Sequence, residues 1–268
     1  RKHVAQVVAS QQLSNVKPST IHRRLAIVSA ALHWAEEEGF IAENPVPRFK
    51  RPKATPERIP PPTLEEQDRL IAAAAPHIRR VIIIGVALGL RVGSSELLRL
   101  KWSDFDSSLE NVRVTAARKN PDRPWRDLFV REDLRPTLAA WRAEDEAARR
   151  EAESRGEVVA GLYEHVVSFR GRHVLSIKNG WRNTLRRAGI TRRIRPYDLR
   201  HAFATYALDN GANLKAVAEN MGHADVQMVL RHYGHVINGQ RRDAMLKAPL
   251  PSLPKANLGG QAGGHFSG

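Results

Sequence analysis

Between Pro196 and Tyr233 the chain reads PYDLRHAFATYALDNGANLKAVAENMGHADVQMVLRHY. The pattern predicts a helix that carries Arg200, a Met-Gly turn followed by His223, and a further short helical run that ends at the tyrosine. Arginine and histidine bind anions, and a tyrosine oxygen that attacks phosphorus forms a covalent ester. Taken as one site, these side chains predict chemistry on a phosphate group.

Three pieces of this segment, YDLRHAFAT, MGH and YGH, occur in that order. They resemble the C-terminal signature of the tyrosine recombinases, the phage integrase family, in which a helix with xxLRHxxAT precedes an LGH-like turn and the nucleophilic tyrosine. The resemblance implies a site-specific DNA recombinase in which Arg200 and His223 bind the scissile phosphate and Tyr233 forms a 3′-phosphotyrosyl intermediate. It also implies that no metal, ATP or other cofactor is required, because paired guanidinium groups stabilise the transition state and the ester retains the bond energy.

A second block, GLRVGSSELLRLKWSDFD at Gly89–Asp106, places glycines on both sides of Arg91. Ser94 or Ser95 is predicted to cap a short helix that contains Glu96. By pattern alone, Arg91 is equally well explained as a surface arginine in a loop. The block resembles the first arginine motif of the family, GLRxxELxxLxWxDxD, and this implies a catalytic role for Arg91 and an orienting role for Glu96.

The chain departs from the family at Tyr197, where many members carry the first histidine of HxLRH. That histidine is assigned to proton transfer from the nucleophile, whereas a neutral phenol, with a pKa of about 10, is a poor base at neutral pH. A phenol can still donate a hydrogen bond to a phosphate, so we expect activity to be retained. His201 matches the histidine of the family's LRH; we expect it to be structural, with a helper role in catalysis as the alternative.

Two alternating runs, Asn111–Ala116 and Trp125–Val130, predict an antiparallel hairpin with turn residues between them. Lys119 lies at or near this turn, where family members place a mobile catalytic lysine. The resemblance implies that Lys119 protonates the departing 5′-oxygen. Arg118, one residue away, is an alternative for this position, and an ordinary solvent-facing lysine is the other interpretation.

Apolar residues at helical spacing predict a helix over Ser19–Gly39, with Arg23 and Arg24 near its start. This stretch resembles the last part of the family's core-binding domain, so we expect these arginines to contact DNA; a solvated face is the alternative. The next segment is rich in proline and basic residues, which excludes a regular helix. We interpret it as a linker in which Arg51 and Lys53 lie along the DNA backbone, with a plain spacer as the alternative.

Further helices are expected from a capping box at Thr63 and Glu66, from Pro76 onward, and over 131–154 and 176–188, with a strand or edge segment over 161–169. The predicted fold is therefore mainly α with a small antiparallel β-sheet (α+β). Its expected parts are a partial helical core-binding domain at 1–44, a linker at 45–62, a catalytic domain at 63–247 and a disordered tail at 248–268.

The composition favours a nucleic-acid partner. A formal net charge of +15 attracts acidic partners, although a basic surface can also serve solubility alone. The arginine-rich run before the signature adds Arg193 and Arg195 as candidate DNA contacts. The absence of cysteine excludes disulfides, thiolate metal sites and a cysteine nucleophile, and the histidines around Tyr233 lack further ligands at zinc-like spacing, so no metal site is expected. No apolar run approaches the roughly 20 residues of a membrane span and no secretory signal follows Arg1, so we expect a cytoplasmic protein with no membrane partner.

The sequence leaves alternative functions open. The first is a recombinase that assembles as a tetramer on two duplexes of double-stranded DNA. The second is a DNA-binding member of the family that has lost catalysis, and the third is a type IB topoisomerase-like enzyme that nicks and rejoins a single duplex. A covalent adduct through Tyr233 separates the second from the others, and joining of strands between duplexes separates the first from the third.

Overall fold

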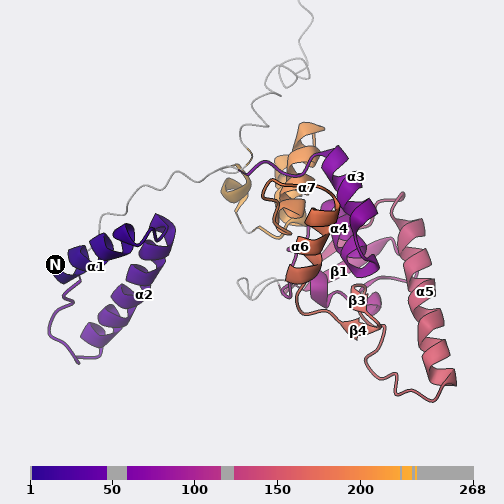
Figure 1. Cartoon of the computed structure of the whole chain (residues 1–268), viewed down its shortest axis with the longest axis horizontal. Helices are drawn as coiled ribbons and strands as arrows, with labels where there is room; N and C mark the ends of the chain where they lie inside the picture. Colours follow the sequence, from indigo (N-terminus) through magenta and orange to yellow (C-terminus); the bar gives the residue numbers. More distant parts are fainter. Residues whose placement is uncertain (1, 47–58, 116–123, 224, 231–232, 234–268) are drawn as a thin grey trace, which may run out of the picture. The chain divides into compact units, whose positions relative to one another are not determined.

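The computed structural model describes residues 2–46, 59–115, 124–223, 225–230 and 233 (Figure 1). These residues divide into two compact units, Arg1–Arg58 and Ile59–Gly268, with the boundary inside the segment interpreted as a linker. The expected tail lies outside the described residues, as does most of the linker. Within the described ranges, no helix is both long enough and apolar enough to cross a membrane.

The first unit contains helices α1 (Lys2–Leu13) and α2 (Pro18–Glu37). Helix α2 confirms the helix predicted from Ser19, and it begins with proline, whose missing N–H is not needed in a first turn. Gly39 follows its end in a left-handed conformation, with φ of 75°. Helix α1 was not predicted. Arg23 and Arg24 are exposed on α2.

Helix α4 (Pro76–Leu88) packs against α3 (Leu64–Ala73) and α7 (Asp198–Asp209) in the second unit (Figure 1). It confirms the apolar helix predicted from Pro76, and it is buried on most sides through Ile78, Val81, Ile82, Ile84 and Leu88. The predicted capping box at the start of α3 is also confirmed: the Glu66 N–H donates to Thr63 Oγ1 over 3.2 Å, and the Thr63 N–H donates to Glu66 Oε2 over 2.8 Å. The core of this unit therefore forms where the sequence is most apolar.

Strands β1 (Asn111–Thr115) and β2 (Trp125–Phe129) form the predicted antiparallel hairpin, with Asn111 opposite Phe129 and Thr115 opposite Trp125. The strand or edge segment predicted over 161–169 is confirmed only in part. His165 forms an isolated antiparallel bridge with Lys101, and β3 (Ser168–Phe169) pairs with β4 (Arg172–His173). The left-handed backbone at Gly161 and Tyr163 turns the chain before β3 and prevents a continuous strand.

Helix α5 (Arg135–Ser154) begins four residues later than predicted from 131, because proline occupies its first turn. Helix α6 (Lys178–Arg187) confirms the helix expected over 176–188, and α8 (Leu214–Asn220) follows α7 within the signature. The short helix predicted to be capped by Ser94 or Ser95 is wrong in its start. A 3-10 turn, η1 (Leu97–Arg99), begins after Glu96 and has no side-chain cap. The reason is that the Glu96 carboxylate accepts a hydrogen bond from the backbone N–H of Arg91 and organises this turn itself.

Residues 59–62 of the expected linker belong to the second unit and are hydrogen-bonded to its helices. The carbonyl of Pro62 accepts hydrogen bonds from Gln67 Nε2 over 3.0 Å and from Tyr206 Oη over 3.1 Å. Arg192 donates hydrogen bonds to the carbonyls of Pro60 and Pro61 and to the carboxylate of Glu66. These bonds fix the position of the backbone just before α3.

Candidate active site

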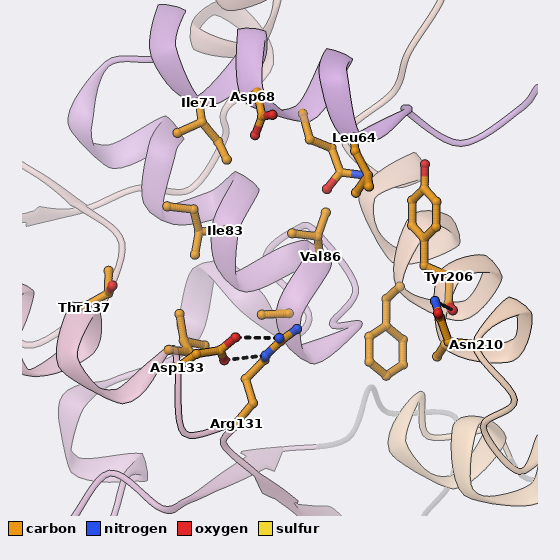
Figure 2. Close-up of a pocket in the computed structure, with 15 residues that line it drawn as sticks. Leu64, Asp68, Ile71, Ile83, Val86, Arg131, Asp133, Thr137, Tyr206 and Asn210 are labelled. Carbon is orange, nitrogen blue, oxygen red and sulfur yellow. Dashed lines mark hydrogen bonds and ion pairs between the residues drawn. The ribbon is translucent and has the colours of Figure 1, made fainter.

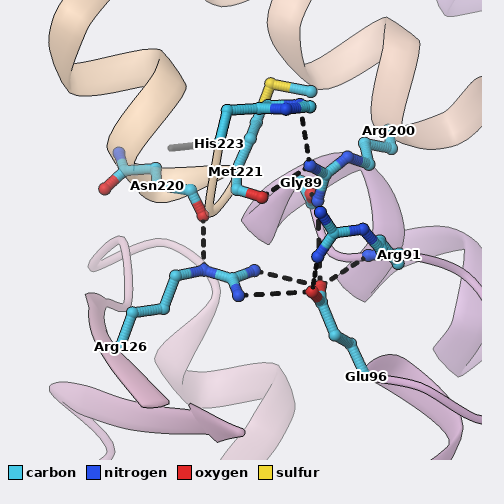
Figure 3. Close-up of polar contacts among 8 residues, drawn as sticks. All are labelled: Gly89, Arg91, Glu96, Arg126, Arg200, Asn220, Met221 and His223. Atoms are coloured by element: carbon cyan, nitrogen blue, oxygen red, sulfur yellow. Dashed lines mark hydrogen bonds and ion pairs between the residues drawn. The ribbon is translucent and has the colours of Figure 1, made fainter. Parts of the chain in front are cut away.

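Arg200 occupies the centre of the candidate site, and its side chain is completely buried on α7. Its Nη1 donates to the Gly89 carbonyl over 2.9 Å, and its Nη2 donates to the Met221 carbonyl over 2.5 Å (Figure 3). The same Nη2 lies 3.1 Å from His223 Nε2. Burial, reinforced by the positive charge of Arg91, lowers the pKa of Arg200 to about 10. Arg200 is therefore still a cation at neutral pH.

The carbonyl that holds Arg200 depends on the glycine at the end of α4. Gly89 has φ of +62°, and a Cβ at this position would lie 2.4 Å from the ring of Phe203. Both the left-handed backbone and the closeness of the ring exclude a side chain here. Glycine is required at the start of the arginine motif because the chain turns there and the Gly89 carbonyl accepts a hydrogen bond from Arg200.

Glu96 forms ion pairs with arginines from three separate segments of the chain, namely Arg91, Arg126 and Arg200 (Figure 3). Its side chain is fully buried and forms an ion pair with the Arg91 guanidinium, while its Oε2 accepts from the Arg91 backbone N–H over 2.9 Å. Arg200 Nη1 lies 3.7 Å from the same Oε2. Burial favours the neutral acid, but the hydrogen bonds and charges of Arg126 and Arg91 outweigh it and lower the pKa of Glu96. The carboxylate therefore holds these arginines in fixed positions.

Arg126 on β2 is a member of this cluster that the sequence did not single out. Its Nη1 and Nη2 donate to the two oxygens of Glu96 over 3.3 and 3.0 Å, and its Nε donates to the Asn220 carbonyl over 2.8 Å. A Cβ on Gly222 would lie 2.9 Å from Arg126 Nη1, so the turn before His223 fits closely over this guanidinium. The alternation of the strand could have revealed it. Arg126 lies on the same face as the buried Leu128, so its side chain is expected to point toward the protein and not toward solvent.

Tyr233 and His201 form a second group of site residues. Tyr233 is only 5% exposed, and its Oη lies 2.5 Å from Nδ1 of His201. Tyr197 is 39% exposed and packs edge-on against the His201 ring, with 5.1 Å between the ring centroids. Burial raises the pKa of Tyr233, with a further contribution from Tyr197, whereas the positive charge of Arg200 opposes the rise.

Helix α7 joins the two groups because Arg200 and His201 are consecutive residues on it. The structure thus brings Arg91 and Arg200 together at Glu96, with His223 in contact with Arg200. It also brings Tyr197 and Tyr233 into contact with His201. Several other predicted site residues, Arg51, Lys53, Arg118 and Lys119, lie outside the described residues. Of the remaining candidate DNA contacts, Arg193 is exposed, and Arg195 is exposed with its Nη2 2.6 Å from Asp198.

No group of three or more histidine, cysteine, aspartate or glutamate side chains is placed to hold a metal ion in the part of the chain that the structure describes. A separate hollow of about 710 Å³ lies between α3, α4 and α7, with Ile71, Ile83 and Val86 in its wall and the Arg131–Asp133 ion pair at its rim (Figure 2). The described residues that line it do not include those of the candidate site. The site is thus a cluster of charged and aromatic side chains distinct from this hollow.

Comparison with known proteins identifies the family of the chain. The model of the phage integrase family matches residues 63–239, which is more than half of the chain. Tyrosine recombinase XerC of Xanthomonas campestris is 25% identical over 225 residues, covering 82% of this chain and 65% of that protein. The chain thus spans slightly less than two thirds of the length of this relative.

Solved structures show the same fold. The integrase of transposon Tn1549, in complex with transposon right end DNA, matches with a TM-score of 0.70 and 17% identity, covering 91% of this chain and 84% of that one. A lambda integrase tetramer bound to a Holliday junction matches with a TM-score of 0.65 and 18% identity, covering 86% and 63%. The prediction of a mainly α fold with a small antiparallel sheet is confirmed. The family model matches more than half of the chain, and the matched range includes Arg91, Arg200 and Tyr233. The chain therefore belongs to the phage integrase family.

Proposed function

We propose that this chain is a site-specific DNA recombinase that cleaves and rejoins strands through a covalent bond between Tyr233 and a 3′-phosphate. The observation that carries the proposal is the excess of positive charge around Glu96. The guanidinium groups of Arg91, Arg126 and Arg200 share this one buried carboxylate. Because buried charges are costly unless they are paired, the cluster is suited to a further anion, and a phosphodiester supplies one.

Arg91 and Arg200 are the proposed ligands of the non-bridging phosphate oxygens. The Arg91 side chain is 28% exposed, so its guanidinium is reachable from solvent, and Nε of Arg200 has no hydrogen-bond partner among the described residues. Guanidinium groups bind two oxygens at once, and they stabilise the additional negative charge of the pentacoordinate transition state. His223, in contact with Arg200, adds a further donor to the same phosphate.

Tyr233 is the proposed nucleophile. Its oxygen attacks phosphorus, and Lys119 protonates the departing 5′-oxygen. In the alternative register, Arg118 takes this position and stabilises the developing charge on the oxygen by hydrogen bonding. The resulting ester retains the energy of the broken bond, so the 5′-hydroxyl of another strand can reverse the step without ATP. The charge stabilisation that a metal would provide is assigned to the arginine pair.

The proposed partners are duplex DNA with specific recombination sites and further copies of this chain, assembled as a tetramer. Support comes from the net charge of +15 and from the lambda integrase structure, which is a tetramer on a Holliday junction. The proposed backbone contacts are Arg23, Arg24, Arg51, Lys53, Arg193 and Arg195, and the proposed place of action is the cytoplasm. Such contacts provide affinity that depends on salt but do not specify a sequence.

Strand transfer between duplexes tests this proposal. Two duplexes of different length carry candidate recombination sites selected by binding, and only one is labelled. We expect a labelled product of recombinant length with the wild-type protein. Arg200→Lys should reduce its formation by about 100- to 1,000-fold, because an ammonium cannot bind two oxygens in a fixed plane. Religation confined to the original duplex would favour the topoisomerase-like alternative.

A further inference from the structure

His201 is in direct contact with the proposed nucleophile. It follows Arg200 on α7, is partly buried, and its Nδ1 lies 2.5 Å from Tyr233 Oη. A neutral imidazole carries one donor and one acceptor nitrogen, so a tyrosine O–H that donates to Nδ1 requires the proton on Nε2. At this separation a proton can pass between the two side chains without a bridging water.

Tyr233 needs a proton acceptor at this position. The phenol is buried, and its raised pKa means that little phenolate is present at neutral pH. Among the described residues, the titratable and charged groups that act on it include Tyr197, Asp198 and Arg200, together with His201 itself. Of these, only the positive charge of Arg200 favours ionisation of the phenol. Ionisation before attack is therefore unfavourable, and removal of the proton during attack is the easier route.

The histidine side chain suits this task better than the other candidates. Imidazole has an ordinary pKa of about 6.5, whereas a phenol such as Tyr197 has a pKa of about 10 and does not accept protons at neutral pH. Asp198 is fully buried and already accepts hydrogen bonds from the backbone N–H and the guanidinium of Arg195. The Tyr197 ring instead packs at a steep angle against the His201 ring, which limits rotation of the imidazole.

We propose that His201 is the general base that accepts the proton of Tyr233, and that Tyr197 positions its imidazole ring. The inference rests on the proposed strand cleavage. As the bond between Tyr233 Oη and phosphorus forms, the phenolic proton moves to Nδ1; the bond between phosphorus and the 5′-oxygen breaks, and that oxygen takes a proton from the hairpin general acid. In rejoining, the imidazolium returns its proton to the departing tyrosine. In this chain the residue that accepts the proton is therefore the one that follows Arg200 on α7.

A matched set of variants tests the assignment by single-turnover cleavage of a nicked suicide duplex at several pH values. His201→Asn places an amide oxygen near the position of Nδ1, so it can accept a hydrogen bond but not a proton. We expect it to bind DNA as the wild type does, to cleave about 100- to 10,000-fold more slowly, and to gain rate steadily as the pH rises. His201→Ala should be equally slow and should be accelerated by added imidazole. His77→Gln, a change to a partly buried histidine that packs against Phe169, is the control and should match the wild type.

Each other outcome overturns the inference. If His201→Asn cleaves at the wild-type rate with the wild-type pH profile, the contact only positions Tyr233. If His201→Ala or His201→Asn cleaves faster, the contact restrains the nucleophile instead of activating it. If the wild type forms no adduct that is absent in Tyr233→Phe, the proposed function itself fails, which distinguishes that failure from failure of the base assignment.

Discussion

Nη2 of Arg126 lies 3.0 Å from Oε2 of Glu96, and this pair connects the β-hairpin to the arginine motif after α4. The same guanidinium binds the Asn220 carbonyl, just before the turn that carries His223. Three segments distant in sequence are thus fixed to one another by one side chain (Figure 3). The hairpin whose turn is expected to contain the catalytic lysine is therefore anchored directly to the residues proposed to bind phosphate.

Replacing Arg126 should weaken the fold and cleavage together. Arg126→Gln removes the hydrogen bonds that join the hairpin to Glu96 and to the Asn220 carbonyl, and loss of a hydrogen bond to a charged group typically costs about 1.5–3 kcal/mol of unfolding free energy. Urea denaturation measures this change. Arg113→Gln breaks an exposed pair with Asp127 on the same hairpin and is the control, for which we expect little change. Equal stability of Arg126→Gln and the wild type would show that the contact is not needed to hold the hairpin.

A methyl group at Gly89 should disrupt the Arg200 site. Gly89→Ala requires a left-handed alanine, which costs about 1–2 kcal/mol, and it places a carbon 2.4 Å from the Phe203 ring. The carbonyl that accepts from Arg200 must then move, so we expect both a lower melting temperature and slower cleavage. Gly93→Ala adds a carbon where no atom lies within 4 Å and should be tolerated. A fully active Gly89→Ala protein would contradict this account of the turn.

The Glu66–Arg192 pair should make stability depend on acidic pH. The Arg192 hydrogen bond lowers the pKa of Glu66 from 4.5 to about 2. Because the folded-state pKa lies below the unfolded one, the pair stabilises the fold above pH 4.5, and this contribution disappears as the pH falls toward 2. Glu66→Gln removes the charge but keeps a side chain that can complete the capping box. Denaturation midpoints of the two proteins should differ at pH 7 and converge near pH 2, whereas a constant difference would exclude this origin.

Tyr197→Phe should leave cleavage close to the wild-type rate. The proposed contribution of Tyr197 is the packing of its ring against His201, which phenylalanine reproduces. The measurement is single-turnover cleavage over a range of pH. A large loss of rate with unchanged DNA binding would show that the phenol hydroxyl itself takes part, as a hydrogen-bond donor to the phosphate.

Local pattern explains which parts of the fold were predictable. The capping box at Thr63, the apolar run after Pro76 and the alternation over Asn111–Thr115 each depend on neighbours in sequence, and each gave the correct element. Helix α1 has few large apolar side chains and no capping signal, so periodicity did not reveal it. The strand or edge segment expected over 161–169 is confirmed only in part because backbone turns override a short apolar run.

The candidate site residues could be proposed from the sequence, but not all of their contacts. Arg200, His223 and Tyr233 were proposed from the spacing of the C-terminal signature, and Arg91 was proposed from the separate Gly89–Asp106 block. Contacts between distant segments have no such local signature. Arg126 joins Glu96 across 30 positions, and His201 meets Tyr233 across 32. These contacts change the expectation for His201, since a histidine in direct contact with the nucleophile has a chemical role available to it.

The position of the covalent bond tests the central claim most directly. A nicked suicide duplex is labelled at the 5′ end of the strand to be cleaved, and wild type and Tyr233→Phe are compared on a denaturing gel. The account predicts that the labelled upstream fragment migrates attached to the wild-type protein, because its 3′-phosphate is esterified to tyrosine, and that no adduct forms with the variant. If both proteins bind the duplex with steep salt dependence and neither forms an adduct, or if the variant forms one too, Tyr233 is not the nucleophile.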